Sequence, residues 1–228
     1  LAIASETPIV VVDVMRGGPS TGIPTKAEQS DLNIALYGMH GDAPHIVVAP
    51  NSVEDCIFTT QWSVHLAESL QTAAIVLSDQ SLGQAQAIID EPASHHFVTR
   101  RLLQTAAPET GKYLRYENTV SGVSPMAIPG TKGCQYTADG LEHTQGALPS
   151  SMESDHVMQM DKRLRKLTQF DYGTHWADIE GDGDTAVITW GSCTGAVREA
   201  LARLRAQGQA IRLISIRLLF PVLPEQFQ

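Results

Sequence analysis

The chain has 228 residues, of which 43% are hydrophobic and 18% charged, so it can bury one large core or two modest ones. Its formal net charge of −9 argues against nucleic acid or an anionic membrane as the main partner. No apolar run approaches the roughly 20 residues that a transmembrane helix needs. The three cysteines are far apart and form no CxxC pair, so we expect free cytoplasmic thiols, no disulfide and no metal bound by this chain.

The chain is organised around a strand that runs into a loop rich in glycine and proline. Residues 8–14 are almost continuously apolar and β-branched, which predicts a parallel strand covered on both faces. Arg16 follows, and residues 17–25 then carry glycines, prolines and hydroxyl side chains. Open α/β sheets bind ligands beyond the carboxyl ends of their strands, and arginine holds a carboxylate with two parallel hydrogen bonds. The pattern therefore predicts an anion site at Arg16, with a solvated loop arginine as the alternative.

The next elements alternate between helix and strand. A serine at position 52 with an acid three residues later predicts the start of a helix. The expected helices cover residues 27–37, 52–70 and 82–89, and the expected strands cover residues 46–49 and 73–77. Apolar residues recur every fourth position in the second helix, which predicts a stripe facing the core at Phe58, Trp62, Leu66 and Leu70. This alternation predicts a parallel sheet with right-handed crossovers.

Residues 92–180 are polar and rich in turn signals, and we expect a long connector there. One helix is predicted within it, over residues 152–167. Its expected apolar stripe consists of Val157, Met160, Leu164 and Leu167. The basic residues at positions 162–166 suit the carboxyl end of a helix.

A second α/β unit is predicted from residue 184 onward. Strands are expected over residues 185–190 and 211–216, joined by a helix whose buried face consists of Val197, Ala200, Leu201 and Leu204. The Gly-Asp-Gly sequence at 181–183 precedes a strand, and no asparagine follows it, so we interpret it as a linker turn rather than a magnesium site. The small-residue turn at 191–195 lacks the lysine of a phosphate-binding loop, so it does not match that motif.

Three ordered motifs resemble one known family. They are residues 16–32 (RGGPSTGIPTKAEQSDL), 37–44 (YGMHGDAP) and 47–56 (VVAPNSVEDC). Their sequence and spacing resemble the alpha subunit of 2-oxoacid:ferredoxin oxidoreductases, above all the 2-oxoglutarate type. The resemblance continues through residues 77–79, 140–143 and 162–166 to Gly191, and so covers nearly the whole chain.

The resemblance implies an α/β fold with a parallel sheet. Residues 1–95 are expected to be the carboxyl-terminal portion of a thiamine-enzyme pyrimidine-binding domain, and residues 96–181 a connector. Residues 182–228 are expected to be the amino-terminal portion of a transketolase C-terminal-like α/β domain. On this reading both domains are truncated, and the chain is a fragment of a larger protein.

The resemblance also implies site residues. Arg16 is expected to meet the carboxylate of the 2-oxoacid, and Thr25 to form a hydrogen bond beside it. The residues expected to support the loop are Gly17, Gly18, Ser20 and Thr21. No nucleophile is expected in this chain, because thiamine diphosphate supplies the carbon that attacks the carbonyl group.

The implied reaction is oxidative decarboxylation of the 2-oxoacid with coenzyme A, giving acyl-CoA, carbon dioxide and electrons for ferredoxin. The implied cofactors are thiamine diphosphate, Mg²⁺ and a [4Fe-4S] cluster, bound mainly by a beta subunit in an (αβ)₂ complex. Two alternatives stay open at this point. One is another thiamine-dependent 2-oxoacid enzyme, and the other is a non-catalytic anion-binding α/β module.

Overall fold

The computed structural model describes residues 1–93, 95, 97, 100–109 and 111–227. A four-stranded sheet holds the amino-terminal part together, with its strands in the order β1-β3-β2-β9. Its strands are β1 (Ile9–Met15), β2 (Ile46–Val48), β3 (Ala73–Asp79) and β9 (Leu218–Phe220). The first three run parallel, as predicted, whereas β9 pairs antiparallel with β2.

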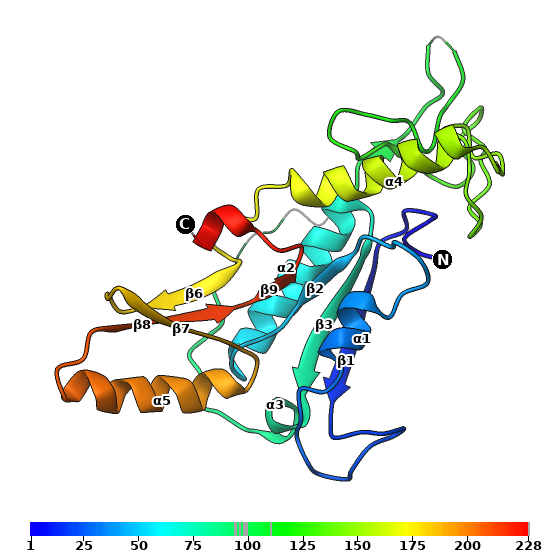
Figure 1. The fold of residues 1–228 in the computed structure, drawn as a ribbon. Coiled ribbons are helices and arrows are strands. Elements are labelled where there is room, and N and C mark those ends of the chain that lie inside the picture. The colour runs from blue at the N-terminus through cyan, green and yellow to red at the C-terminus, as the bar shows by residue number, and fades with distance from the viewer. Residues whose placement is uncertain (94, 96, 98–99, 110, 228) are drawn as a thin grey trace.

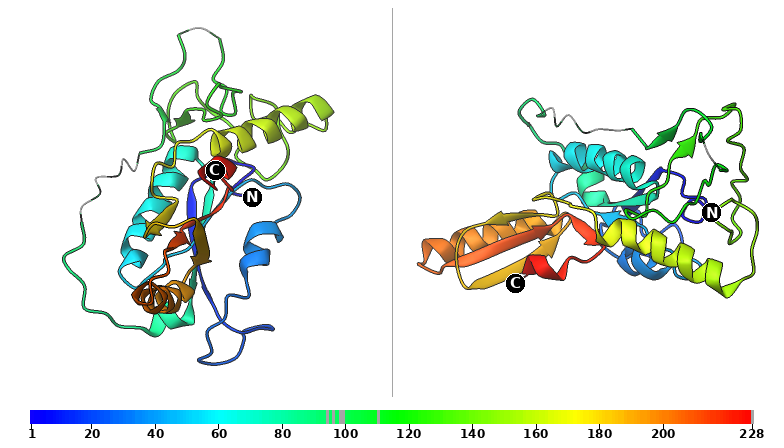
Figure 2. Two further views of the ribbon diagram at one scale, coloured as in Figure 1. Left: turned by 60° about the vertical axis from the view of Figure 1, so that its left-hand side comes forward. Right: turned by 90° about the horizontal axis from the view of Figure 1, so that it is seen from above.

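Two helices cover opposite faces of this sheet (Figure 2). The long helix α2 (Asp55–Leu70) buries Trp62, Leu66 and Leu70, and Phe58 packs at the edge of the same cluster, so the predicted stripe is confirmed. On the other face, the short helix α1 (Leu32–Tyr37) packs against Met15 and Leu77. A third short helix, α3 (Gln80–Gln84), follows β3 directly and is shorter than the helix predicted over residues 82–89.

Strand β1 differs from the prediction that it is covered on both faces. Val12 and Val14 point to one face and Val11 to the other, and these three side chains are 55%, 50% and 47% exposed. The cause is its place in the sheet, because β1 is an edge strand and only β3 lies beside it within the described chain. An apolar strand sequence therefore indicated the sheet correctly but not the position within it.

Helix α1 begins later than predicted. Residues 27–30 are not helical, because they are tied to the preceding loop instead. The Lys26 carbonyl accepts a hydrogen bond from the Gly17 amide, and the Ser30 hydroxyl donates to the Arg16 carbonyl. Long-range contacts therefore outweigh local helix propensity in this segment.

The predicted connector contains the strand pair β4 (Leu103–Gln104) and β5 (Met126–Ala127) and the helix α4 (Glu153–Thr168). In Figure 1 these lie beyond the amino ends of β1 and β3, opposite the glycine-rich loop. The predicted apolar stripe of α4 is wrong. Leu167 is buried, but Val157 and Leu164 are exposed, and the rest of the buried face consists of Gln159, Lys162, Arg163 and Lys166.

A second sheet has the strand order β6-β8-β7, with β6 (Ala177–Glu180), β7 (Thr185–Trp190) and β8 (Ile211–Ile216). Strand β6 lies within the residues predicted as connector and pairs antiparallel with β8. Helix α5 (Cys193–Ala206) follows β7, as predicted. Of its expected buried face only Leu201 is fully buried, and Ala200 is exposed.

The chain returns to the first sheet near its end. Arg217 alone separates β8 from β9, so the two sheets meet at this residue, and the short 3₁₀ helix η1 (Pro224–Phe227) follows. In the described part of the chain, no helix is both long and apolar enough to span a bilayer.

Candidate functional site

Arg16 lies where the sequence predicts a site, directly beyond the carboxyl end of β1. Its neighbour Met15 pairs with Asp79, the last residue of β3, so Arg16 and Asp79 belong to the same edge of the sheet. Figure 1 shows the loop after β1 and the short helix α3 together at this end of the strands. This is the edge at which open α/β sheets bind ligands.

The loop of residues 16–26 is held by its own hydrogen bonds. The Gly17 amide donates to the Lys26 carbonyl at 3.2 Å, and the Ile23 amide donates to the Gly17 carbonyl at 2.6 Å. Gly22 has a φ of +87°, and a β-carbon there would lie 2.8 Å from the Arg16 side chain. Only glycine fits this close approach without strain, so the loop wraps around Arg16.

Arg16 is half-buried in this loop. Its Nε donates to the Thr21 carbonyl. Within the described residues its two terminal nitrogens have no hydrogen-bond or ion-pair partner. They form a planar cationic fork that suits a carboxylate or a phosphate.

The other predicted site residues differ in what they contribute. Thr25 is exposed and has a φ of +55°. The next residue, Lys26, accepts a hydrogen bond at its carbonyl from the Gly17 amide. The backbones of Thr25 and Arg16 therefore lie near each other at the neck of the loop, where its two ends meet. Gly17 supplies backbone hydrogen bonds, and Thr21 supplies its carbonyl rather than its hydroxyl. Gly18 and Ser20 are exposed, and Ser20 has a φ of +59°.

Sequence reasoning missed a polar seam between the two sheets. The Asn51 amide oxygen accepts from the Gly191 amide at 3.2 Å, and the Asn51 amide nitrogen donates to the Ser215 carbonyl at 3.1 Å. Asp79 caps α3 by accepting from the Ser81 and Leu82 amides. Asn51 and Asp79 follow or end strands of the first sheet, a position that could have marked them in the sequence.

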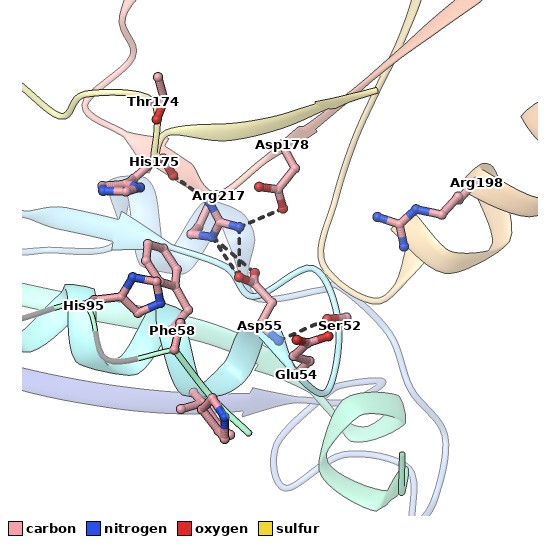
Figure 3. Close-up of a pocket in the computed structure, with 13 residues that line it drawn as sticks. Ser52, Glu54, Asp55, Phe58, His95, Thr174, His175, Asp178, Arg198 and Arg217 are labelled. Atoms are coloured by element: carbon pink, nitrogen blue, oxygen red, sulfur yellow. Dashed lines mark hydrogen bonds and ion pairs between the residues drawn. The ribbon is translucent and has the colours of Figure 1, made fainter. Parts of the chain in front are cut away.

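A pocket of about 560 Å³ lies at the amino end of α2, between the two sheets. As Figure 3 shows, Arg217 occupies its wall between Asp55 and Asp178, with the rings of Phe58 and His175 beside it. Burial, together with the positive charge of Arg217 and the nearby His95 and His65, lowers the pKa of His175. The ring therefore favours its neutral form.

No group of three or more histidine, cysteine, aspartate or glutamate side chains that could hold a metal ion occurs among the described residues. The turn at 181–183 joins β6 to β7. Gly181 and Gly183 both have positive φ angles there. The Gly-Asp-Gly sequence thus connects two strands of the second sheet.

Comparison with known proteins gives a consistent picture. The family described as pyruvate flavodoxin/ferredoxin oxidoreductase, thiamine diphosphate-binding, matches residues 1–163. The chain is 36% identical to the 2-oxoglutarate oxidoreductase subunit KorA of Mycobacterium tuberculosis, over 97% of this chain and 34% of that protein. It is 32% identical to the 2-oxoglutarate synthase subunit KorA of Methanothermobacter marburgensis, over 96% of this chain and 58% of the relative.

A solved structure agrees in fold. The 2-oxoglutarate:ferredoxin oxidoreductase from Magnetococcus marinus, determined with 2-oxoglutarate, coenzyme A and succinyl-CoA bound, matches with a TM-score of 0.86 and 41% identity. The match covers 99% of this chain and 40% of that one. The chain thus spans between 34% and 58% of the length of these three proteins.

Proposed function

This chain belongs to the pyruvate flavodoxin/ferredoxin oxidoreductase family of thiamine diphosphate-binding proteins, and from that premise we propose that it acts as the alpha subunit of a 2-oxoglutarate:ferredoxin oxidoreductase. The proposed reaction converts the 2-oxoacid, coenzyme A and two oxidised ferredoxins into acyl-CoA, carbon dioxide, a proton and two reduced ferredoxins. The similarity to proteins named for 2-oxoglutarate supports this choice of acid.

The single observation that carries the proposal is the free fork of Arg16 at the carboxyl edge of the sheet. A 2-oxoacid must be held so that its carbonyl carbon faces a nucleophile and its carboxylate leaves as carbon dioxide. Arg16 binds and orients that carboxylate, and the hydroxyl of Thr25 donates a hydrogen bond at the neck of the same loop. Gly17, Gly18, Ser20 and Thr21 shape the loop around the guanidinium.

The cofactors divide between subunits in this proposal. Thiamine diphosphate supplies a nucleophilic carbon when it is bound. Among the described residues no three or more histidine, cysteine, aspartate or glutamate side chains are grouped so that they could hold a metal ion, and the cysteines Cys56, Cys134 and Cys193 are separate free thiols. We therefore assign the Mg²⁺ and the [4Fe-4S] cluster mainly to a beta subunit, in an (αβ)₂ complex that reduces ferredoxin. Free thiols also support a cytoplasmic location.

The domain division proposed for this chain follows the same family. Residues 1–95 form the pyrimidine-binding type of domain, residues 96–181 the connector and residues 182–228 the transketolase C-terminal-like portion. In this arrangement the anion loop belongs to the first domain. The turn after β7 belongs to the second.

The test is reduction of a viologen, dependent on coenzyme A, by the assembled complex, with 2-oxoglutarate compared with pyruvate. Arg16→Ala should lower kcat/KM about 30- to 1000-fold, since loss of a charged hydrogen-bonding clamp costs roughly 2–4 kcal/mol of transition-state binding. Arg203→Ala is the matched control, because it removes an arginine whose side chain is 76% exposed on α5.

Each outcome decides one part of the proposal. Full activity in the Arg16→Ala complex would remove Arg16 from the substrate site. A preference for pyruvate would overturn the choice of 2-oxoglutarate. Inactivity of the unmodified complex with both acids would favour a different thiamine-dependent enzyme or a binding module.

A further inference from the structure

Gln29 joins the anion loop to the second α/β unit. Its amide nitrogen donates to the Trp190 carbonyl at 3.0 Å, and its amide oxygen accepts from the Cys193 thiol at 3.6 Å. Trp190 is the last residue of β7, and Cys193 is the first of α5. Both ends of one side-chain amide are therefore engaged by a turn more than 160 residues away in the sequence.

The turn is shaped to receive this side chain. Gly191 has a φ of +67°, and a β-carbon there would lie 2.4 Å from the Gln29 amide nitrogen. Asn51 fixes the turn from the other side, because its amide oxygen accepts from the Gly191 amide and from the Thr194 hydroxyl. The carboxylate oxygen Oδ2 of Asp79 is buried 3.9 Å from the same β-carbon position. The surroundings of the Gln29 side-chain amide are thus closely packed and polar.

The neighbouring residue holds Arg16. The Ser30 hydroxyl donates to the backbone carbonyl of Arg16 at 3.0 Å. Gln29 and Ser30 are adjacent, so the backbone of Arg16 is linked to the turn after β7 through a single peptide unit. Residues 16–26 close on themselves by their own backbone hydrogen bonds. The internal shape of the loop is therefore local, whereas its orientation depends on how its ends are held.

We infer that Gln29 and Ser30 form a clasp that sets the position of the Arg16 fork relative to the second α/β unit. Gln29 is thus a positioning residue for 2-oxoacid binding, an inference that rests on the proposed role of Arg16. Residues 27–30 lie outside any helix and are largely exposed. The side-chain contacts of Gln29 and Ser30, rather than helical hydrogen bonds, therefore hold this segment in place.

Kinetics of the assembled complex test the clasp. Gln29→Ala and Ser30→Ala should each raise KM for the 2-oxoacid about three- to tenfold, as expected for one lost hydrogen bond. KM for coenzyme A should stay unchanged. Ser30→Thr keeps the hydroxyl and should restore the KM of the unmodified complex. Gln209→Ala is the matched control, since Gln209 is an exposed glutamine in the turn after α5.

A second readout follows Cys193 directly. This thiol is exposed, whereas Cys134 is buried and serves as an internal reference for alkylation measured by mass spectrometry. If substrate binding and the clasp are coupled, each must stabilise the other. Addition of 2-oxoglutarate should therefore slow alkylation of Cys193 in the unmodified complex and have no such effect in Gln29→Ala.

The outcomes separate the clasp from the proposed function. If Arg16→Ala raises KM but Gln29→Ala and Ser30→Ala do not, and substrate leaves Cys193 alkylation unchanged, the clasp is wrong and the substrate site stands. If Arg16→Ala leaves KM unchanged, the substrate site itself fails and Gln29 has nothing to position. A raised KM in both clasp variants, with rescue by Ser30→Thr, supports the inference.

Discussion

Arg217 holds the carboxylate of Asp55 with two nitrogens, at 2.8 Å from Nη2 to Oδ1 and 3.1 Å from Nε to Oδ1. Asp55 is the first residue of α2, and Arg217 is the one residue between β8 and β9. The same guanidinium donates to Asp178 at 2.7 Å and lies over the ring of Phe58. Burial opposes the charge, but these two carboxylates raise the pKa of Arg217. One ion-pair network therefore ties the first sheet to the second.

Replacing Arg217 should destabilise the protein strongly. Arg217→Met leaves the Asp55 carboxylate, whose side chain is 11% exposed, without its partner, and breaking such a buried pair costs about 3–5 kcal/mol. The measurement is the free energy of unfolding in urea. Asp178→Asn is the control, since that side chain is 44% exposed and its loss should cost no more than about 1 kcal/mol. Equal effects of the two changes would contradict a network centred on Asp55.

Glu6 should give the protein an acid-sensitive step in stability. Its carboxylate is fully buried, 2.5 Å from the Lys162 ammonium and 3.1 Å from that of Lys166. Burial alone would raise the pKa of Glu6, but the two lysines outweigh burial and lower it from 4.5 to about 2. The unfolded chain therefore takes up a proton near pH 4.5, whereas the folded chain does so only near pH 2. The stabilisation is complete above pH 4.5 and is lost as pH falls toward 2.

The variant Glu6→Gln tests this step. At neutral pH it should lose about 3–5 kcal/mol, because it leaves buried cations without their carboxylate. Between pH 4.5 and 3 its unfolding free energy should depend less on pH than that of the unmodified protein. Glu199→Gln removes an exposed glutamate from α5 and should leave the pH profile unchanged. Parallel pH profiles for Glu6→Gln and the unmodified protein would contradict the assignment.

The sequence predicted those features that depend on local pattern. The β-branched run before Arg16 and the four-residue spacing in α2 both led to the observed strand and helix. The position of Arg16 at a strand end followed from the place where this apolar run stops. These predictions held because hydrophobic spacing and strand polarity are properties of short segments.

The predictions that failed concern side chains whose partners lie far away in the sequence. The buried face of α4 is charged because Glu6, near the amino terminus, pairs with Lys162 and Lys166, and no spacing within the helix reveals that. The contact between Gln29 and Trp190 was not predicted either, because the two residues are 161 positions apart in the sequence. The sequence analysis did not single out Arg217, because its partner Asp55 is 162 residues away in the sequence. Long-range polar pairing therefore escaped a reading based on period and local composition.

Two leucines of helix α4 test which face of the helix is buried. Leu167 is fully buried, so Leu167→Ala should cost about 2–5 kcal/mol of unfolding free energy. Leu164 lies on the predicted apolar stripe but is 45% exposed, and Leu164→Ala should cost clearly less. Urea unfolding of the two variants compares the same chemical change on two faces of one helix. A larger cost at position 164 would mean that the helix is rotated relative to this structure.

The loop around Arg16 should be sensitive at Gly22 and tolerant at Gly18. Gly22→Ala places a β-carbon 2.5 Å from the Gly17 carbonyl oxygen and 2.8 Å from the Arg16 side chain, at a φ of +87° that L-residues rarely adopt. At Gly18 the space is open. Since the strain falls on the segment that wraps Arg16, Gly22→Ala should raise KM for the 2-oxoacid about tenfold or more, for roughly 1.4 kcal/mol or more of lost binding.

Gly18→Ala should leave the 2-oxoacid KM within about twofold of the unmodified complex, a free-energy change of roughly 0.4 kcal/mol. Thermal unfolding of both variants shows whether the effect is local to the loop. A Gly22→Ala complex with an unchanged midpoint and a raised KM places the strain at the Arg16 fork. An unchanged KM would show instead that the wrapped conformation of residues 16–26 is dispensable for binding.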